Sequence, residues 1–293
     1  MPNWSQLLNQ VEQYSDNISE LNKLRDKYIA DIASITNRNV ITYYSGWLKS
    51  PNAPNIDINE QDKNAFMSCI YHLDQTKGLD IILHTPGGDI AAMEGIVNYL
   101  RSVFGTDIRA VIPQICMSAG SMIAISCKEI VMGKQSALGP IDPQYGGLAC
   151  QTVLEEFSSA VADISNNPSS RDLWQVIFGK LNPTFITECK NAIHWAEQLV
   201  NTWLPSVNPN INMQNFLNVF LNHQNTFTHS RRISRDDCRA LGLNILDLEG
   251  DQKLQDAVLS LHHCYMILFD KYNYSKAMEN NIGSHYFQRF SAQ

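Results

Sequence analysis

The stretch "HTPGGDIAAMEGIVNYL" (residues 84–100) joins an apolar run to an amphipathic one through a Pro-Gly-Gly turn. The apolar run before it, "LDIILHT" (79–85), is short and has the composition of a strand that is buried on both faces of a sheet. Asp89 is well placed to cap a helix after the turn. That helix has one apolar face, made by Ile90, Met93, Ile96, Val97, Leu100 and Phe104. The segment therefore predicts a strand, a tight turn and a helix in succession.

A second unit of the same kind follows directly. "DIRAVIPQ" (107–114) predicts a strand, and "CMSAGSMIAIS" (116–126) predicts a sharp turn of small residues that leads into a short helix. "EIVMG" (129–133) predicts a further strand. Because strands and helices alternate, we expect an α/β fold with a mainly parallel sheet and right-handed crossovers. The two small-residue turns then lie at the same end of two successive strands.

The regions around these units are largely helical in their apolar spacing. Residues 5–35 predict two helices or one broken helix outside the sheet, 39–47 predict a strand, and 59–76 predict a helix. "ISRDDCRALGLN" (233–244) predicts a capped helix that ends at Gly242, followed by a helical tail. The chain divides into an N-terminal helical segment (1–36), an α/β core (37–149), a helical insertion or cap (150–222), and a return to the core with a C-terminal helical tail (223–293).

The composition is that of a globular protein and disfavours several classes. The chain has 293 residues, 44% hydrophobic and 17% charged, enough for one well-buried core and an appended piece. Its formal net charge of −7 disfavours nucleic-acid binding. The seven cysteines are scattered and contain no C-x-x-C pair, so we expect reduced thiols. His262, His263 and Cys264 are adjacent and point in different directions on a helix, which disfavours a metal site there.

The sequence also carries no signal for export or membrane insertion. Its start, "MPNWSQLLNQVEQYSDN", has neither the basic region nor the apolar core of a secretion signal. No stretch approaches the roughly 18 uncharged apolar residues of a transmembrane helix. We therefore expect a cytoplasmic protein without a transmembrane segment.

Ser118 is the candidate nucleophile because it stands in the second turn, directly before a helix. Backbone N–H groups and the helix dipole favour negative charge at such a position. The N–H of Ala119 is a natural donor to the oxyanion of a tetrahedral intermediate. Gly87 and Gly88 leave room for a second donor, since they carry no side chain. Each turn alone is explained by close packing of a helix on a sheet, but the two together favour a nucleophile facing an oxyanion hole.

A serine hydroxyl needs a base near neutral pH, and a carboxylate to orient that base. Of the eight histidines, His84 precedes the Pro-Gly-Gly turn, and His229 lies in the polar loop "NTFTHSRRISRDD". The residues alone do not choose between these two. Asp142 in "ALGPIDPQYGG" is the candidate carboxylate because prolines on both sides restrict its backbone. Asp89 is its rival, although capping a helix already explains that residue.

The motifs "HTPGGDI", "MSAGSMIA", "EIVMG" and "SALGPIDPQ" resemble the ClpP/crotonase superfamily. They are most similar to the serine dehydrogenase proteinase family, SppA-like serine proteases without a membrane span. The resemblance runs from "RNVITYYSGWL" through "TFTHSRRISRDDCRALGLN" into the C-terminal tail. It implies a ClpP/crotonase-like core of repeated ββα units. It also implies a serine-type endopeptidase with a triad of Ser118, Asp142 and His229.

The resemblance further implies how the site works and what the protein associates with. The oxyanion hole would be formed by Gly87 or Gly88 and Ala119, with no cofactor and no metal. His229 matches a Thr-His-Gly-Arg-like segment of the family, but this chain has Ser230 in place of the glycine. Superfamily relatives form closed rings, which implies a homo-oligomer acting on polypeptide substrates. The cleavage preference, the oligomer size and any activating protein partner stay open.

Two other hypotheses are alternatives to this triad. In a Ser-Lys dyad of the SppA type, Lys134 or Lys190 would replace the histidine as the base. Alternatively, the fold is a catalytically silent scaffold or a crotonase-like acyl-thioester site. The serine in the second turn argues against the crotonase reading, because that chemistry has no need of it.

Overall fold

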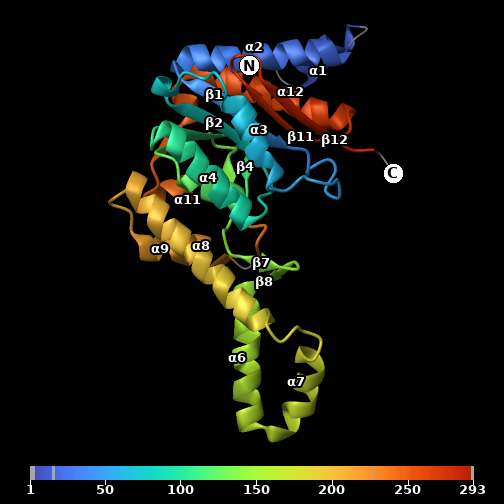
Figure 1. Cartoon of the computed structure of the whole chain (residues 1–293), viewed down its shortest axis with the longest axis vertical. Coiled ribbons are helices and arrows are strands. Elements are labelled where there is room, and N and C mark those ends of the chain that lie inside the picture. Colours follow the sequence, from blue (N-terminus) through green and yellow to red (C-terminus); the bar gives the residue numbers. More distant parts are fainter. Residues whose placement is uncertain (1–3, 15–16, 227, 292–293) are drawn as a thin grey trace.

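The computed structural model describes residues 4–14, 17–226 and 228–291. Outside this range lie residues 1–3 and 15–16 of the predicted N-terminal segment, residue 227, and residues 292–293 of the predicted C-terminal tail. A seven-stranded sheet runs through the body of the molecule that lies uppermost in Figure 1, in the order β10-β5-β3-β2-β1-β11-β12. The strands are β1 (Asn39–Ser45), β2 (Leu79–His84), β3 (Ile108–Ile112), β5 (Glu129–Met132), β10 (Ile245–Asp247), β11 (Tyr274–Asn280) and β12 (His285–Arg289).

The sheet is parallel from β10 to β1, and β11 and β12 add to it in antiparallel fashion. Helices cover both of its faces, so the strands are apolar on both sides. Along β1, Ile41 and Tyr43 belong to one core, whereas Val40 and Tyr44 belong to the other. The predicted α/β class with a mainly parallel sheet is confirmed.

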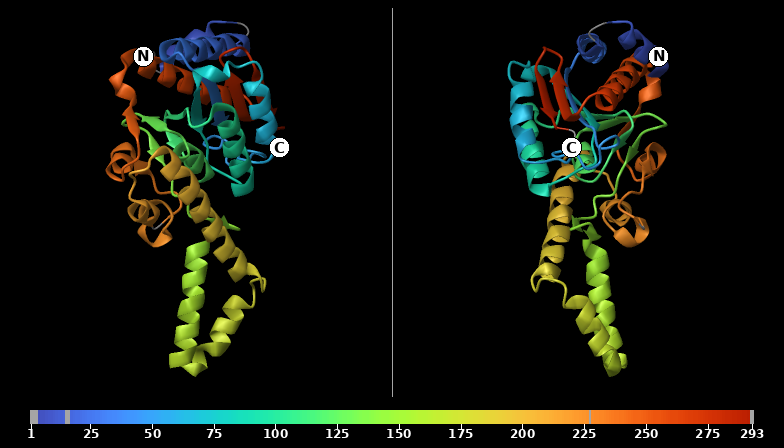
Figure 2. Two further views of the ribbon diagram at one scale, coloured as in Figure 1. Left: turned by 60° about the vertical axis from the view of Figure 1, so that its left-hand side comes forward. Right: turned by 90° about the vertical axis from the view of Figure 1, so that its right-hand side faces the viewer.

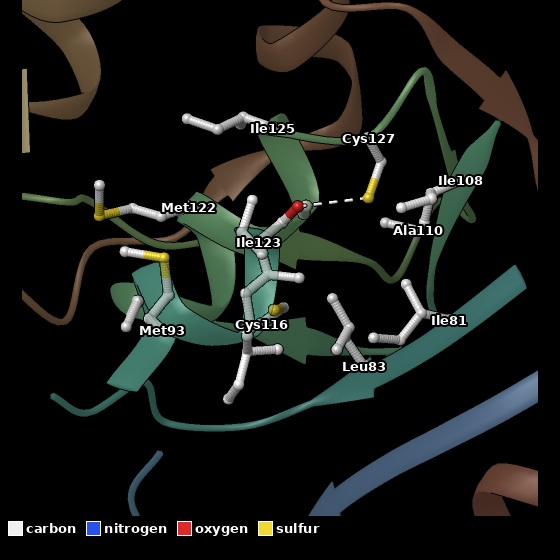
Figure 3. Close-up of a cluster of buried hydrophobic side chains, with 14 of the residues drawn as sticks. Ile81, Leu83, Met93, Ile108, Ala110, Cys116, Met122, Ile123, Ile125 and Cys127 are labelled. Atoms are coloured by element: carbon white, nitrogen blue, oxygen red, sulfur yellow. Dashed lines mark hydrogen bonds between the residues drawn. The ribbon is translucent and has the colours of Figure 1, made fainter. Parts of the chain in front are cut away.

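The first core contains the helices that follow the two small-residue turns. It includes side chains of α3 (Gln61–Ile70), α4 (Ile90–Phe104) and α5 (Ala119–Ile125). Figure 3 shows part of it, where Ile81 and Leu83 of β2 share a cluster with Met122 and Ile123 of α5. The second core lies on the other face, under α1 (Trp4–Glu12), α2 (Asn17–Thr36) and α12 (Gln252–Lys271), as Figures 1 and 2 show.

A small second sheet brings three distant segments together beside the main one. Its strands are β4 (Ile115–Cys116), β6 (Ala137–Leu138) and β9 (Ile233–Ser234), in that order. β4 leads into the Ser118 turn, β6 leads into the segment with Asp142, and β9 follows the loop with His229. The capping box of Ser234 and Asp237 then starts α11 (Arg235–Ala240), which confirms the capped helix predicted there. This small sheet thus pairs the strands that adjoin the segments with Ser118, Asp142 and His229.

The region 150–222 is helical, as predicted. It contains α6 (Cys150–Asn166), the 3-10 turn η2 (Pro168–Ser170), α7 (Arg171–Phe178), α8 (Phe185–Val207) and α9 (Met213–Phe220). Trp203 of α8 and Phe216 and Phe220 of α9 are buried in the first core. In contrast, α6, α7 and the start of α8 extend away from the sheet (Figures 1 and 2). We call this outer part, residues 150–195, the arm; it does not lie over the sheet.

The predicted helical tail is wrong after Lys271. The remaining chain forms the hairpin of β11 and β12, although "YSKAMEN" (274–280) is rich in residues that favour helices. Every residue of β11 is buried, and its two charged side chains are paired, Lys276 with Asp62 and Glu279 with Arg25. These tertiary contacts outweigh local propensity.

The remaining elements are short. They are η1 (Gln75–Lys77), β7 (Gln144–Tyr145), β8 (Leu148–Ala149), α10 (His223–Thr226) and η3 (Leu248–Gly250). The predicted helix over 59–76 is shorter in the structure, because α3 ends at Ile70. All seven cysteines are buried and free, as expected for reduced thiols. Within the described ranges, no helix is both long enough and apolar enough to span a bilayer.

Candidate active site

Ser118 stands in a strained turn between β4 and α5. Its backbone angles are φ +50° and ψ −121°, in a region that residues with a side chain rarely adopt. The turn is fixed by hydrogen bonds from Met117 N to Thr85 O at 3.0 Å and from Gly120 N to Met117 O at 2.8 Å. A serine on a strained strand-to-helix turn is the arrangement of a nucleophile elbow, which exposes the hydroxyl. Ser118 is accordingly half-buried, not enclosed.

The Pro-Gly-Gly turn packs directly against this serine. A Cβ atom on Gly87, whose φ is +98°, would lie 2.5 Å from Ser118 Cβ and 3.0 Å from Ala119 N. Only glycine therefore lets the two turns approach this closely. Gly88 packs against another segment, because a Cβ there would lie 2.3 Å from Ile58 N. The Pro-Gly-Gly turn and the Ser118 turn therefore lie in direct contact in the structure.

The backbone N–H groups around the serine differ in what they bind. Gly87 N donates to Thr85 Oγ1 at 3.2 Å. Among the described residues, the N–H groups of Gly88 and Ala119 make no hydrogen bond. These two N–H groups thus keep their capacity to donate, whereas the N–H of Gly87 already donates to Thr85.

Asp142 holds two histidines, not one. Its side chain is 1% exposed, and Oδ1 lies 2.8 Å from His229 Nδ1, while Oδ2 lies 2.7 Å from His223 Nδ1. Gln144 Nε2 also donates to Oδ2 at 2.8 Å. The hydrogen bond from Ile141 N to Phe220 O, at 2.7 Å, ties the Asp142 segment to the end of α9. A buried carboxylate with this set of donors is suited to orienting an imidazole.

The two histidines line different surroundings. His229 borders a cavity of about 260 Å³ whose wall includes Pro86 and Met117, the residues next to Gly87 and Ser118 in the chain. Both histidines border a second cavity of about 520 Å³ that also contains Gln144. His229 therefore shares a cavity with residues of both turns. Within the part of the chain that is described, Ser118 Oγ makes no hydrogen bond, and catalytic contacts often tighten only when substrate binds.

His223 is the residue that sequence reasoning missed. It lies six residues before His229 in the same polar stretch, on the first turn of α10. Two histidines so close to each other were a usable signal. Their common partner Asp142 is 81 residues before His223, however, so only the fold shows that both bind it.

His84 does not belong to this site. Its side chain is 0% exposed and packs against Trp47, with ring centroids 4.3 Å apart, and against His262, at 5.1 Å. Burial and the nearby His262 hold the pKa of His84 well below its ordinary value. His84 is therefore a neutral core residue, enclosed away from any substrate.

The other rival residues have structural explanations or lie exposed. Asp89 Oδ1 accepts a hydrogen bond from Ala92 N at 2.8 Å and so caps α4, as predicted. Lys134 and Lys190 are both exposed. A lysine that serves as a base is normally buried, since burial disfavours its charged form. Neither lysine has such surroundings.

One group of side chains away from Ser118 has the spacing of metal ligands. Asp26, Glu279 and His285 place one ligand atom each within 4.8 Å of one another. Glu279 is already bound by Arg25 Nε at 2.7 Å and by His285 Nδ1 at 2.7 Å. Although burial raises the pKa of Glu279, Arg25 and His285 lower it to about 2 overall. This group is explained as a buried ion-pair network.

Comparison with known proteins bears on the turns and on Asp142. Residues 6–169, more than half of the chain, match the family described as ClpP-like SDH-type serine proteinase. This range includes Ser118 and Asp142 but ends before His223 and His229.

Two uncharacterized proteins of Methanocaldococcus jannaschii are also similar. MJ0137 is 30% identical over 106 residues, which is 36% of this chain and 37% of that protein. MJ1495 is 34% identical over 100 residues, or 34% of each chain. The chain thus aligns with about a third of the length of these curated relatives. Since the family match spans more than half of the sequence, this chain belongs to the family of ClpP-like SDH-type serine proteinases.

Proposed function

We propose that this chain hydrolyses peptide bonds of polypeptides through an acyl-enzyme on Ser118, with His229 as the base and Asp142 as its orienting carboxylate. The observation that carries the proposal is the arrangement of the groups around Ser118. This strained, half-buried serine packs against Gly87. His229 is bound to the buried Asp142 and borders a cavity whose wall includes residues of both turns.

The proposed reaction follows the roles of a serine triad. His229 donates its Nδ1–H to Asp142 Oδ1, so its Nε2 is free to take the proton of Ser118 Oγ. The oxygen then attacks the scissile carbonyl carbon, and the carbonyl oxygen becomes an oxyanion that accepts hydrogen bonds from the N–H groups of Gly88 and Ala119. His229 returns the proton to the leaving amine. Water repeats these steps on the acyl-enzyme, which releases the acid and restores Ser118.

His223 is the competing base, because it binds the same carboxylate through the same ring nitrogen. We favour His229, since Pro86 and Met117 line a cavity with His229, whereas the 520 Å³ cavity that His223 borders is lined by neither residue. In this proposal His223 supports Asp142 from its other oxygen. A Ser-Lys dyad is disfavoured because Lys134 and Lys190 are exposed.

We also propose that the protein is a homo-oligomer whose copies meet through the arm. Helix α7 has no buried residue, and Leu173, Val176 and Ile177 on one of its faces are 62%, 65% and 42% exposed. Contiguous exposed apolar side chains mark interaction sites. A permanent partner stabilises such a helix continuously, whereas a transient substrate does not, and most permanent assemblies are formed by copies of one chain.

The decisive experiment is intact-mass analysis after incubation with diisopropyl fluorophosphate. We expect one adduct on the wild type and none on Ser118→Ala. His229→Ala should lose most of the labelling rate, and His223→Ala should retain it in large part. Loss in His223→Ala alone would move the base to His223, and loss in neither would favour a lysine. A wild type that is never labelled would favour the silent scaffold.

A further inference from the structure

The Pro-Gly-Gly turn is supported by a short stretch of chain, residues 56–59, which we call the backing segment. Ile58 N donates to Gly87 O at 2.7 Å, and Asp89 N donates to Ile58 O at 2.9 Å. A Cβ atom on Gly88 would lie 2.3 Å from Ile58 N and 2.4 Å from Ile58 O. Backbone therefore packs against backbone here, and the position of Gly88 depends on the position of Ile58.

The backing segment has little structure of its own. Apart from the bridge between Ile58 and Gly88, it lies in no helix or strand. Two neighbouring strands hold it through its carbonyl groups. Ser45 of β1 donates from Oγ to the carbonyl oxygen of residue 56 at 2.7 Å, and Lys276 of β11 donates from Nζ to that of residue 57 at 2.8 Å. Ser45 and Lys276 are register partners in the sheet, so the two donors stand side by side.

Lys276 forms a fully buried ion pair with Asp62 at this point. Both side chains are 0% exposed, and Nζ lies 2.8 Å from each oxygen of Asp62. With the carbonyl of residue 57, the ammonium group has an acceptor for each of its three N–H donors. Asp62 Oδ2 also accepts from Tyr43 OH at 2.8 Å and from the backbone N–H of Asn59 at 3.0 Å. The pair thus holds the backing segment at both residue 57 and residue 59.

We propose that Lys276, together with Asp62, is a positioning residue for the oxyanion hole, because the pair fixes Ile58 and Ile58 fixes the turn that carries Gly88. The inference rests on the proposed function, in which the Gly88 N–H binds the oxyanion. It gives the C-terminal hairpin, whose strand character the sequence did not reveal, a part in the chemistry. Neither side chain touches the substrate.

The chain offers a matched control for a test. Arg25 and Glu279 form a second ion pair with both side chains 0% exposed, and Glu279 lies on β11 as well. This pair does not contact the backing segment. The test variant is Lys276→Met with Asp62→Asn, and the control variant is Arg25→Met with Glu279→Gln. Each variant removes a buried ion pair. The new amide keeps a carbonyl oxygen that accepts from the same tyrosine hydroxyl, which is Tyr43 OH for Asp62 and Tyr265 OH for Glu279.

The first readout is the kinetics of Ser118 labelling by diisopropyl fluorophosphate at several concentrations. In the test variant, we expect the limiting labelling rate to fall roughly 10- to 100-fold with little change in the half-saturating concentration, because donors misplaced by about an ångström lose transition-state stabilisation. The control variant should label like the wild type at a temperature where all three proteins are folded. Equal losses in both variants would mean general destabilisation and would overturn the inference.

The second readout is hydrogen exchange of peptides that cover residues 56–62 and 85–92. We expect faster exchange of both peptides in the test variant only, since the Ile58 and Asp89 amides form the two bonds of the bridge. Unchanged exchange would overturn the inference whatever the labelling shows, as would faster exchange at an unchanged labelling rate. If the wild type is not labelled at all while exchange rises as expected, the proposed function fails and the positioning contact stands.

Discussion

The core and the arm of this protein differ in how closely their side chains are packed. In the core, the turns at Ser118 and Gly87 pack against each other, and the backing segment that binds the Pro-Gly-Gly turn is itself held by the buried pair of Lys276 and Asp62. In the arm, α7 has no buried residue, and the small cluster there buries only Cys150, Val153 and Cys189. Strained backbone persists only where the surroundings over-determine it. The strained turns thus lie in the closely packed core, whereas the arm exposes apolar side chains.

The largest effect is expected for a change at Asp142, the buried carboxylate that binds His229 and His223. Asp142→Asn keeps the size of the side chain but offers one acceptor oxygen to His229 and His223. We expect the labelling rate of Ser118 to fall on the order of 10⁴-fold, because the imidazole loses its orienting carboxylate. Labelling kinetics with diisopropyl fluorophosphate measure this effect.

The control for that change is Asp89→Asn, because asparagine caps a helix about as well as aspartate. Asp89 lies next to the Pro-Gly-Gly turn and binds Ala92 N, so its replacement should leave the labelling rate unchanged. A large loss in Asp89→Asn with none in Asp142→Asn would assign the carboxylate role to Asp89 and would contradict the proposed triad.

The next largest effect is expected for alanine substitution of Gly87, which is compared with the same substitution at Gly105. Both glycines have a positive φ. In Gly87→Ala, the new Cβ atom would lie 2.5 Å from Ser118 Cβ, so the two turns must separate. We expect the labelling rate to fall roughly 100- to 1,000-fold, as when an oxyanion-hole donor is lost. Gly105→Ala is the control, because its φ is +63° but no atom lies within 4 Å of the added Cβ. If both variants label at the wild-type rate, close contact between the turns is not required for the chemistry.

How much of the fold and of the candidate site could be predicted depends on how far apart in the sequence the interacting residues are. The turns at Gly87 and Ser118 could be predicted because small residues directly follow strand-like runs and precede helix-like ones, although the contact between the two turns is seen only in the structure. Asp142 could be singled out by its flanking prolines. His223 could not be assigned to Asp142, and β11 could not be recognised, because both depend on partners far away in the chain. Lys276 is an example, because its buried partner Asp62 is 214 residues away in the sequence.

For the arm, we expect a large effect on association and little on chemistry. Replacing Leu173, Val176 and Ile177 with serine removes the exposed apolar face of α7. Sedimentation should then show a species of 33.1 kDa in place of a larger assembly, with Ser118 labelled as in the wild type. Met67→Ser, on the 50% exposed Met67 of α3, is the control and should leave the assembly intact. A wild type that sediments as a monomer would contradict self-association through the arm.

The smallest effect concerns the backbone strain at Ser118 itself. Glycine adopts φ +50° and ψ −121° at less cost than a residue with a side chain, so Ser118→Gly should raise the free energy of unfolding by about 1 kcal/mol while abolishing labelling. Thermal and urea unfolding measure the gain. Ser126→Gly is the control, because Ser126 has a helical φ of −76° and its Oγ donates to Ile123 O at 2.7 Å, so glycine there should destabilise. A loss of stability in both variants would mean that the Ser118 turn stores no strain, and the contrast between a strained core and an uncovered arm would then rest on burial alone.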